Sequence, residues 1–236
     1  MLQILLAGLV MAIPAIDELP GGDFAAAVMD MHTGEVLAST GSGVFPLDDP
    51  DIFMLAYVVE MMNDGVMDLE RIVGRDESIA DRFRLGLMGN REAAGRAMWI
   101  VGLETLNSWV AEKGMSDTEL HDIQLLWEGA PVTEPSMSSL ADLLADLRII
   151  YSGIEISSVR YILGDPDMGD GQAAGVGEGW TLYGWVDSGE DHKTFALIAR
   201  SASGRDLGLV LLSDDLCCEE KGDLAMMLLW NAAKEL

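Results

Sequence analysis

The sequence is poor in basic residues, and this shortage excludes several partners. Lysine and arginine number 14 against 40 aspartates and glutamates, which gives a formal net charge of −26. A surface of this sign repels phosphate backbones and anionic lipid headgroups, so we expect no nucleic-acid partner. The acids are scattered along the chain, which favours a salt-adapted or highly solvated surface over an acidic face that meets a basic partner.

Cysteine and histidine are also scarce, and metal-binding patterns are missing. The only two cysteines, Cys217 and Cys218, are adjacent. A disulfide between neighbours is strained and rare, so we expect buried free thiols. The three histidines, His32, His121 and His192, are widely separated. No spacing typical of a zinc site results, and we expect no cofactor.

No apolar run has the length of a membrane-spanning helix. The N-terminal stretch MLQILLAGLVMAIPAIDE has small residues around Ala12 and Ala15, as a secretory signal does, but it lacks a basic start. Two interpretations stay open. Residues 1–15 are a signal peptide of a periplasmic or secreted protein, or they belong to a first helix packed on the domain of a cytoplasmic protein.

What the sequence does contain is a regular order of apolar segments. Half of the 236 residues are hydrophobic, enough for a large core. Two short apolar runs within residues 24–39 flank His32-Thr33-Gly34 and predict a hairpin. Residues 52–65 predict a helix that is apolar on all sides, which is typical of the centre of a domain.

The later segments predict helices followed by strands. Helices are expected over residues 90–102, 103–114 and 133–153, the last of them opened by Thr133 or Ser136. Residues 164–179 are rich in glycine and aspartate and predict a loop. The remaining segments predict three strands and a closing amphipathic helix, over residues 180–186, 194–202, 207–214 and 218–236.

This order predicts an α/β (α+β) fold. Strands from both ends of the chain would form one antiparallel sheet, with the first and last helices on one face. We expect one domain over residues 1–236. Within it, residues 1–45 and 176–236 would form an α/β lobe, and residues 46–175 an all-α lobe.

The arrangement resembles the serine β-lactamase and penicillin-binding DD-peptidase superfamily, most closely its class A-like members. The stretch VMDMHTGEVLAS is similar to the family's opening hairpin, and GVFPLDDPDIFMLAYVVEMM looks like the segment with its nucleophile-bearing helix. EGWTLYGWVDSGEDHKTFALI resembles the catalytic strand and the strand that follows. The resemblance runs from about residue 24 to the C-terminus and implies a hydrolase cleft between two lobes.

The first catalytic motif of that family, S-x-x-K, supplies a hydroxyl nucleophile and a lysine. The resemblance places the nucleophile on Asp48 or Asp49 and the lysine on Asp51 or Ile52. Neither register leaves a hydroxyl or an amine. An acid-rich helix start, which complements the helix dipole, is the more common role of such aspartates. A cation site made of Asp48, Asp49 and Asp51 is the weaker alternative.

The second motif, S-x-N, falls on Met88, Gly89 and Asn90. Only Asn90 matches, and a lone asparagine before a helix is more often a cap. The loop that carries the family's deacylating glutamate looks shortened. Glu128 is the only nearby candidate, and a solvated loop acid is its more common role.

The third motif, K-T-G, falls on Trp185, Val186 and Asp187. In the family, the lysine and threonine help to position the substrate carboxylate. Here an indole would fill the cleft, and Asp187 would repel an anion. The resemblance therefore implies that the strand is kept and that the residues that act in catalysis are replaced.

Loss of all three motifs predicts a non-catalytic homologue, a pseudoenzyme that serves as a binding or structural module. The alternative is a hydrolase of the same superfamily with a relocated or metal-assisted acidic site. A protein partner would be seated by exposed aromatics such as Trp99, Trp109 or Trp185, although core packing is the more common role of tryptophan.

Overall fold

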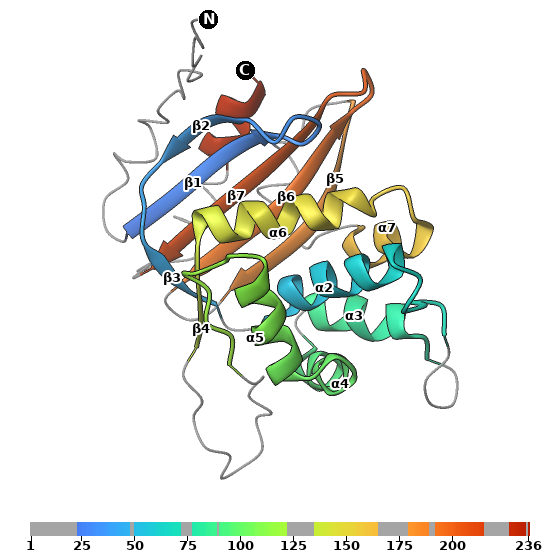
Figure 1. The fold of residues 1–236 in the computed structure, drawn as a ribbon. Coiled ribbons are helices and arrows are strands. Elements are labelled where there is room, and N and C mark those ends of the chain that lie inside the picture. Colours follow the sequence, from blue (N-terminus) through green and yellow to red (C-terminus); the bar gives the residue numbers. More distant parts are fainter. Residues whose placement is uncertain are drawn as a thin grey trace, which may run out of the picture.

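The computed structural model describes residues 23–47, 50–71, 77–88, 90–121, 135–164, 179–188, 192–214, 227–234 and 236. Its centre is a five-stranded antiparallel sheet with the strand order β2-β1-β7-β6-β5 (Figure 1). The strands are β1 (Asp23–Asp30), β2 (Val36–Thr40), β5 (Trp180–Ser188), β6 (Lys193–Ser201) and β7 (Asp206–Asp214). The predicted α/β (α+β) fold, with a sheet built from both ends of the chain, is confirmed.

Both faces of this sheet are buried, which explains why its strands are apolar at nearly every position. Along β1, Ala25, Ala27 and Met29 face one hydrophobic cluster, and Ala26 and Val28 face the other. The strands β6 and β7 alternate in the same way. A shift of one residue would exchange the two faces, so the alternation fixes the register.

Helices cover the two faces. Helix α6 (Leu140–Ser152) lies along one face and contacts β1, β6 and β7 (Figure 1). On the other face, a helix over residues 227–234 packs Leu229, Trp230 and Ala233 against the strands. The closing helix is therefore confirmed for these residues, whereas the N-terminal segment lies outside the described residues.

Between β3 (Val44–Leu47) and β5, most of the described residues are helical. It contains α2 (Asp51–Asn63), α3 (Ile79–Leu87), α4 (Arg91–Val101), α5 (Leu103–Glu112), α6 and α7 (Ser157–Leu163). The predicted central helix is α2, in which every residue from Asp51 to Ala56 is buried. Helices α3 and α7 were not expected from the sequence. The boundaries of the two lobes stay a prediction.

The predicted helix over residues 133–153 begins later than expected, so its opening at Thr133 or Ser136 is wrong. Residues Ser136–Ser139 form the strand β4, which pairs with β3 (Val44–Leu47). Extended backbone lets the Ser136 hydroxyl accept a hydrogen bond from the His121 N–H at 2.9 Å. The helix starts at Leu140, and Ser139 caps it by accepting a hydrogen bond from the Asp142 N–H.

Among the helices of the described ranges, none combines the length and apolarity that crossing a bilayer requires.

Candidate functional site

The first motif lies at the start of α2. Asp51 is the first residue of this helix, and its side chain is 1% exposed. It lies against α3, because a Cβ atom added to Gly86 would come within 2.9 Å of Asp51 Oδ2. Ile52 is fully buried in the core. Asp48 and Asp49 lie outside the described residues.

The second motif lies between α3 and α4. Met88 ends α3, and its side chain is 60% exposed. Asn90 is the N-cap residue of α4, and its Oδ1 atom accepts a hydrogen bond from the Ala93 N–H at 3.0 Å. The Asn90 side chain therefore satisfies a backbone group of its own helix.

The third motif lies on β5, an edge strand of the sheet. Trp185 is 3% exposed and packs into the same hydrophobic cluster as α2 and α3. Val186 points to the opposite face and packs on the cluster there. The backbone of Asp187 pairs with Thr194 of β6. Before them, Gly184 brings two strands together, because a Cβ atom there would lie 2.4 Å from the Ala196 carbonyl oxygen.

Helix α3 brings the three motif segments into one neighbourhood. It contacts α2, α4 and β5. A backbone bridge between Gly164 and Tyr183 also covers part of the outer edge of β5. At the described motif positions the side chains are acidic, amide or apolar, and none supplies a hydroxyl or an amine.

Of the three aspartates in the predicted cation site, Asp51 lies within the described residues. Within the described ranges, no three histidine, cysteine, aspartate or glutamate side chains are grouped so that they could hold a metal ion. Asp48 and Asp49 lie outside these ranges, as do Glu128, Cys217 and Cys218. The cation site at Asp48, Asp49 and Asp51 therefore stays a prediction.

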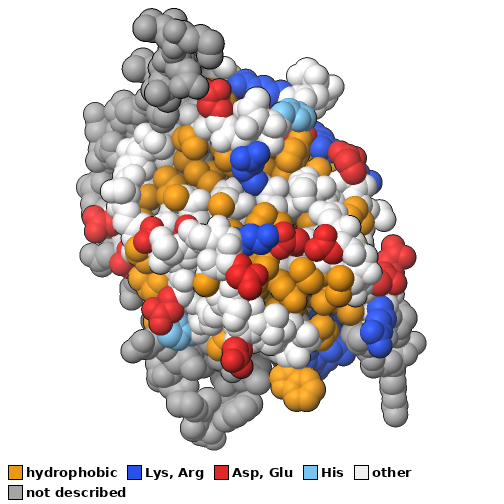
Figure 2. Space-filling view, in the orientation of Figure 1, with side chains coloured by type: hydrophobic (Ala, Val, Ile, Leu, Met, Phe, Trp, Pro, Cys, Tyr) orange, Lys and Arg blue, Asp and Glu red, His pale blue; other side chains and the backbone are white. Residues whose placement is uncertain are grey.

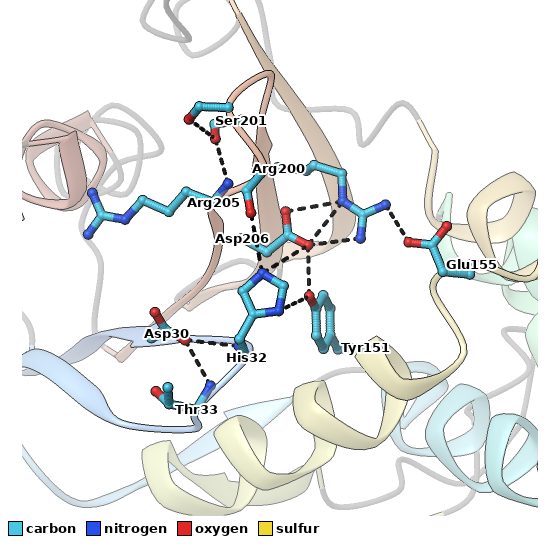
Figure 3. A network of polar contacts seen from close by, with 11 residues as sticks. Asp30, His32, Thr33, Tyr151, Glu155, Arg200, Ser201, Arg205 and Asp206 are labelled. Carbon is cyan, nitrogen blue, oxygen red and sulfur yellow. Dashed lines mark hydrogen bonds and ion pairs between the residues drawn. The ribbon is translucent and has the colours of Figure 1, made fainter.

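A second polar cluster, which we call the Asp206 network, joins β6, β7 and α6 (Figure 3). The buried Asp206 carboxylate accepts hydrogen bonds from Arg200 Nε at 3.1 Å and from Arg200 Nη2 at 2.8 Å. The Tyr151 hydroxyl donates to Asp206 Oδ2 at 2.7 Å. Arg200 Nη1 also pairs with Glu155 Oε1 at 2.8 Å.

The β1–β2 turn joins this network through His32. Its Nδ1 atom lies 3.2 Å from the Tyr151 hydroxyl, and its Nε2 atom lies 3.3 Å from the Gly204 carbonyl oxygen. Asp30 shapes the turn by accepting hydrogen bonds from the N–H groups of His32 and Thr33. The bond from the Thr33 N–H is the main cause that lowers the pKa of Asp30.

The protonation states in the network favour structural stability. Burial, reinforced by the hydrogen bond to Asp206, raises the pKa of Tyr151 to about 12. The hydrogen bond to Asp206 raises the pKa of Arg200 above its ordinary value. At neutral pH the tyrosine is therefore protonated and the arginine charged. The network ties α6 to the turns at one end of the sheet (Figure 3).

The sequence analysis missed this network, although part of it had a signal. The predicted strands over residues 194–202 and 207–214 leave a short connection between them, and Arg200 and Asp206 are direct cross-strand partners beside it. Opposite charges at such positions indicate a cross-strand pair. Tyr151 and His32 approach them only through the packing of α6 and the β1–β2 turn, which no local pattern encodes.

The three candidate tryptophans differ in exposure. Trp99 on α4 is 92% exposed, whereas Trp109 and Trp185 are buried. Trp109 donates its indole N–H to Glu60 Oε2 at 2.5 Å. Of the three, only Trp99 offers its indole to solvent.

Comparison with known proteins finds similarity in structure but not in sequence. No protein-family model matches the chain, and no curated protein sequence does. The described elements instead have the arrangement of the β-lactamase/DD-peptidase fold, and the solved structures similar to it include class A β-lactamases and other β-lactamases.

Three solved structures show the extent of this similarity. An ancestral class A β-lactamase (GNCA) is 16% identical with a TM-score of 0.76, covering 94% of this chain and 97% of its own. A β-lactamase from Xanthomonas campestris pv. campestris is 16% identical with a TM-score of 0.75 and 95% coverage of both chains. A β-lactamase from Sphaerobacter thermophilus is 17% identical with a TM-score of 0.71 and 94% coverage of both. At these identities the similarity establishes the fold.

Proposed function

We propose that the chain is a non-catalytic protein with the β-lactamase fold, a pseudoenzyme that acts as a binding or structural module. The main support is Trp185. At the position where the resemblance places the lysine of the catalytic strand, the chain has an indole that is 3% exposed. A buried indole carries no positive charge to attract a substrate carboxylate, and it has no group that transfers a proton at neutral pH.

The other motif positions support the same proposal. Ile52 is buried in the core and Asn90 caps α4. The net charge of −26 would repel β-lactams and peptidoglycan stem peptides, which carry carboxylates. The strongly exposed Trp99 supports a role in binding a protein partner, because large exposed aromatics are typical of interface anchors.

Reaction with a fluorescent penicillin tests the proposal. The full-length chain is incubated with the probe at neutral pH, denatured and examined for covalent label, next to a class A β-lactamase and a penicillin-binding DD-peptidase as positive controls. We expect no label on the chain. A labelled serine, located by mass spectrometry of the digested protein, would overturn the proposal.

The alternative, a hydrolase with a metal-assisted acidic site, has a separate test. If Asp48, Asp49 and Asp51 hold a cation, millimolar Ca²⁺ or Mg²⁺ should raise the melting temperature. That rise should vanish when all three become asparagine, and it should persist in the control Asp64→Asn, which changes an exposed acid at the other end of α2. Under our proposal, Ca²⁺ and Mg²⁺ raise the melting temperature of none of these proteins, the parent included.

A further inference from the structure

A cavity of about 400 Å³ lies at the opposite edge of the sheet from the motif strand β5. It is bounded by β1, β2, the turn between β2 and β3, and the start of α6. Six apolar side chains line it: Ala27, Val36, Val44, Leu140, Ala141 and Leu144. In Figure 2, hydrophobic side chains gather where β2 and the start of α6 meet. The volume is in the range of small-molecule sites, about 300–1,000 Å³.

The cavity exists because one of its walls is made of backbone. Residues 41–43, Gly-Ser-Gly, carry almost no side-chain volume. Gly41 has a φ of +68°, and a Cβ atom there would lie 1.8 Å from the Phe24 carbonyl oxygen. The close approach to β1 therefore requires glycine, and no side chain at this position can fill the space.

The polar groups of the lining define the head group of a ligand. Ser39, Ser42 and Ser139 supply hydroxyl groups, and Asp117 is the only charged residue among the described lining residues. Asp117 is exposed, and its backbone N–H donates to Asp142 Oδ2 at 2.9 Å, which fixes the turn at this rim. An acid at the rim attracts a cation and repels a carboxylate, and the net charge of −26 acts in the same sense.

We propose that this cavity binds a small amphiphilic amine, with its apolar body between β1, β2 and α6 and its ammonium group at Asp117. The apolar part of the lining favours the apolar body of the ligand, whose burial removes apolar surface from water. The proposal does not depend on whether the chain is catalytic, since none of the described motif residues lines the cavity and the motif strand β5 lies at the opposite edge of the sheet.

Three probes with the same chain and different head groups test the proposal: hexylamine, hexanol and hexanoate. Each is titrated into the full-length ¹⁵N-labelled protein at low salt, and amide shifts are followed by NMR. We expect saturable shifts centred on residues 39–44 and 139–144, with hexylamine binding tightest and hexanoate weakest. Shifts centred elsewhere, no saturation by hexylamine, or hexanoate equal to hexylamine would each overturn the proposal.

Substitutions distinguish the contribution of the ligand's head group to binding from that of its apolar body. Asp117→Asn should weaken hexylamine by about two- to fivefold and leave hexanol unchanged, as expected for a partly exposed ion pair. Glu104→Gln, which removes an exposed acid outside the cavity, should leave hexylamine binding as in the parent.

Filling the cavity should abolish binding of all three probes. Ala141→Phe places a ring in the space, and Ser39→Ile gives an independent filling with a residue that suits a strand. The folded state of each variant is checked by its amide spectrum. Unchanged hexylamine binding in a folded filled variant would overturn the proposal.

Discussion

Two aspartates one turn apart on α6 differ in how their carboxyl groups are accommodated. Asp142 accepts hydrogen bonds from the Asp117 N–H at 2.9 Å and from the Thr118 hydroxyl at 2.8 Å. Asp146 is 0% exposed, and neither of its oxygens has a hydrogen-bond partner within the described part of the chain. Burial raises the pKa of Asp146 well above its ordinary value.

This difference predicts a pH dependence of stability. Because the folded-state pKa of Asp146 is above its unfolded value, its contribution is most favourable below the ordinary carboxyl range and is lost as pH rises through the folded-state pKa. We expect Asp146→Asn to gain stability relative to the parent with rising pH, by up to about 1.4 kcal/mol per pH unit. Urea unfolding of both proteins at pH values of about 4.5, 5.5, 6.5 and 7.5 measures the difference in their free energies of unfolding.

The control for this prediction is Asp142→Asn, four residues earlier on the same helix. It disturbs two hydrogen bonds and should lower the free energy of unfolding by about 1–3 kcal/mol. Equal pH dependence of the parent and Asp146→Asn would contradict the burial of an ionisable carboxyl at position 146.

The tryptophans give a second prediction at this scale. Trp185→Ala removes a buried ring and should lower the free energy of unfolding by about 3–5 kcal/mol. Trp99→Ala removes an exposed ring of the same size and should change it by less than about 0.5 kcal/mol. Chemical denaturation monitored by circular dichroism compares the two. Similar losses would show that Trp185 does not have the core position described above.

At the scale of elements, α6 joins the sheet to the helical segment. Its apolar residues pack on the sheet and on α2, and Tyr151 near its C-terminal end connects it to the Asp206 network. The same helix forms one wall of the cavity at its other end. Substitutions at Tyr151 therefore test how much the Asp206 network contributes to the stability of the contact between α6 and the sheet.

We expect Tyr151→Phe to lower the free energy of unfolding by about 1.5–3 kcal/mol, because it removes a partly buried hydrogen bond to a charged group. Amide hydrogen exchange near the end of α6 should accelerate as well. The matched control is Tyr161→Phe, whose hydroxyl donates to Asp81 at 2.9 Å from a side chain that is 47% exposed. Water replaces this second bond, so a loss as large as that of Tyr151→Phe would argue against the structural role of the network.

Local patterns predicted the elements with strong signals. The apolar residues of α2 and the runs of β6 and β7 are buried as their composition indicated, and the hairpin around His32 forms where expected. Helix α3 was missed, although Ser78 and Asp81 form a capping box that the sequence contains. The strand β4 could not be predicted, because a serine-rich segment becomes a strand only through its distant partner β3.

The motif positions stay a prediction from the resemblance, which assigns them to Asp51, Asn90 and Trp185. Their geometry could not be predicted, because the burial of Asp51 against Gly86 depends on how α2 packs on α3. The cavity beside Gly41 was not foreseen for the same reason. Its walls come from the β1–β2 hairpin, the turn after α5 and the start of α6, which lie far apart along the chain.

At the scale of the whole molecule, electrostatic self-repulsion is the main consequence of the composition. The net charge of −26 opposes compaction, and dissolved salt screens it. Figure 2 shows acidic side chains dispersed over the visible face among neutral and apolar ones. Each pair of dispersed charges repels weakly, but the repulsion energies of all the pairs add up over the molecule.

We expect the melting temperature to rise by several degrees as NaCl increases from about 0.01 M to about 1 M, because each kcal/mol of relieved repulsion is worth about 2–4 °C in a chain of this size. Differential scanning calorimetry in NaCl and in KCl measures the effect. Nonspecific screening predicts the same curve for both salts. A flat melting temperature would mean that repulsion between the acids is not a main term in stability.

The backbone bridge between Gly164 and Tyr183 has a consequence for growth of assemblies. Exposed borders of β-structure recruit foreign strands, which is how fibres extend. Here Gly164 covers part of the outer edge of β5, so an incoming strand would have to displace Gly164 before it could pair beside Tyr183. Arg84 Nη1 helps to hold Gly164 in place by donating to its carbonyl oxygen at 3.2 Å, so fibrillation through this side of the molecule is discouraged.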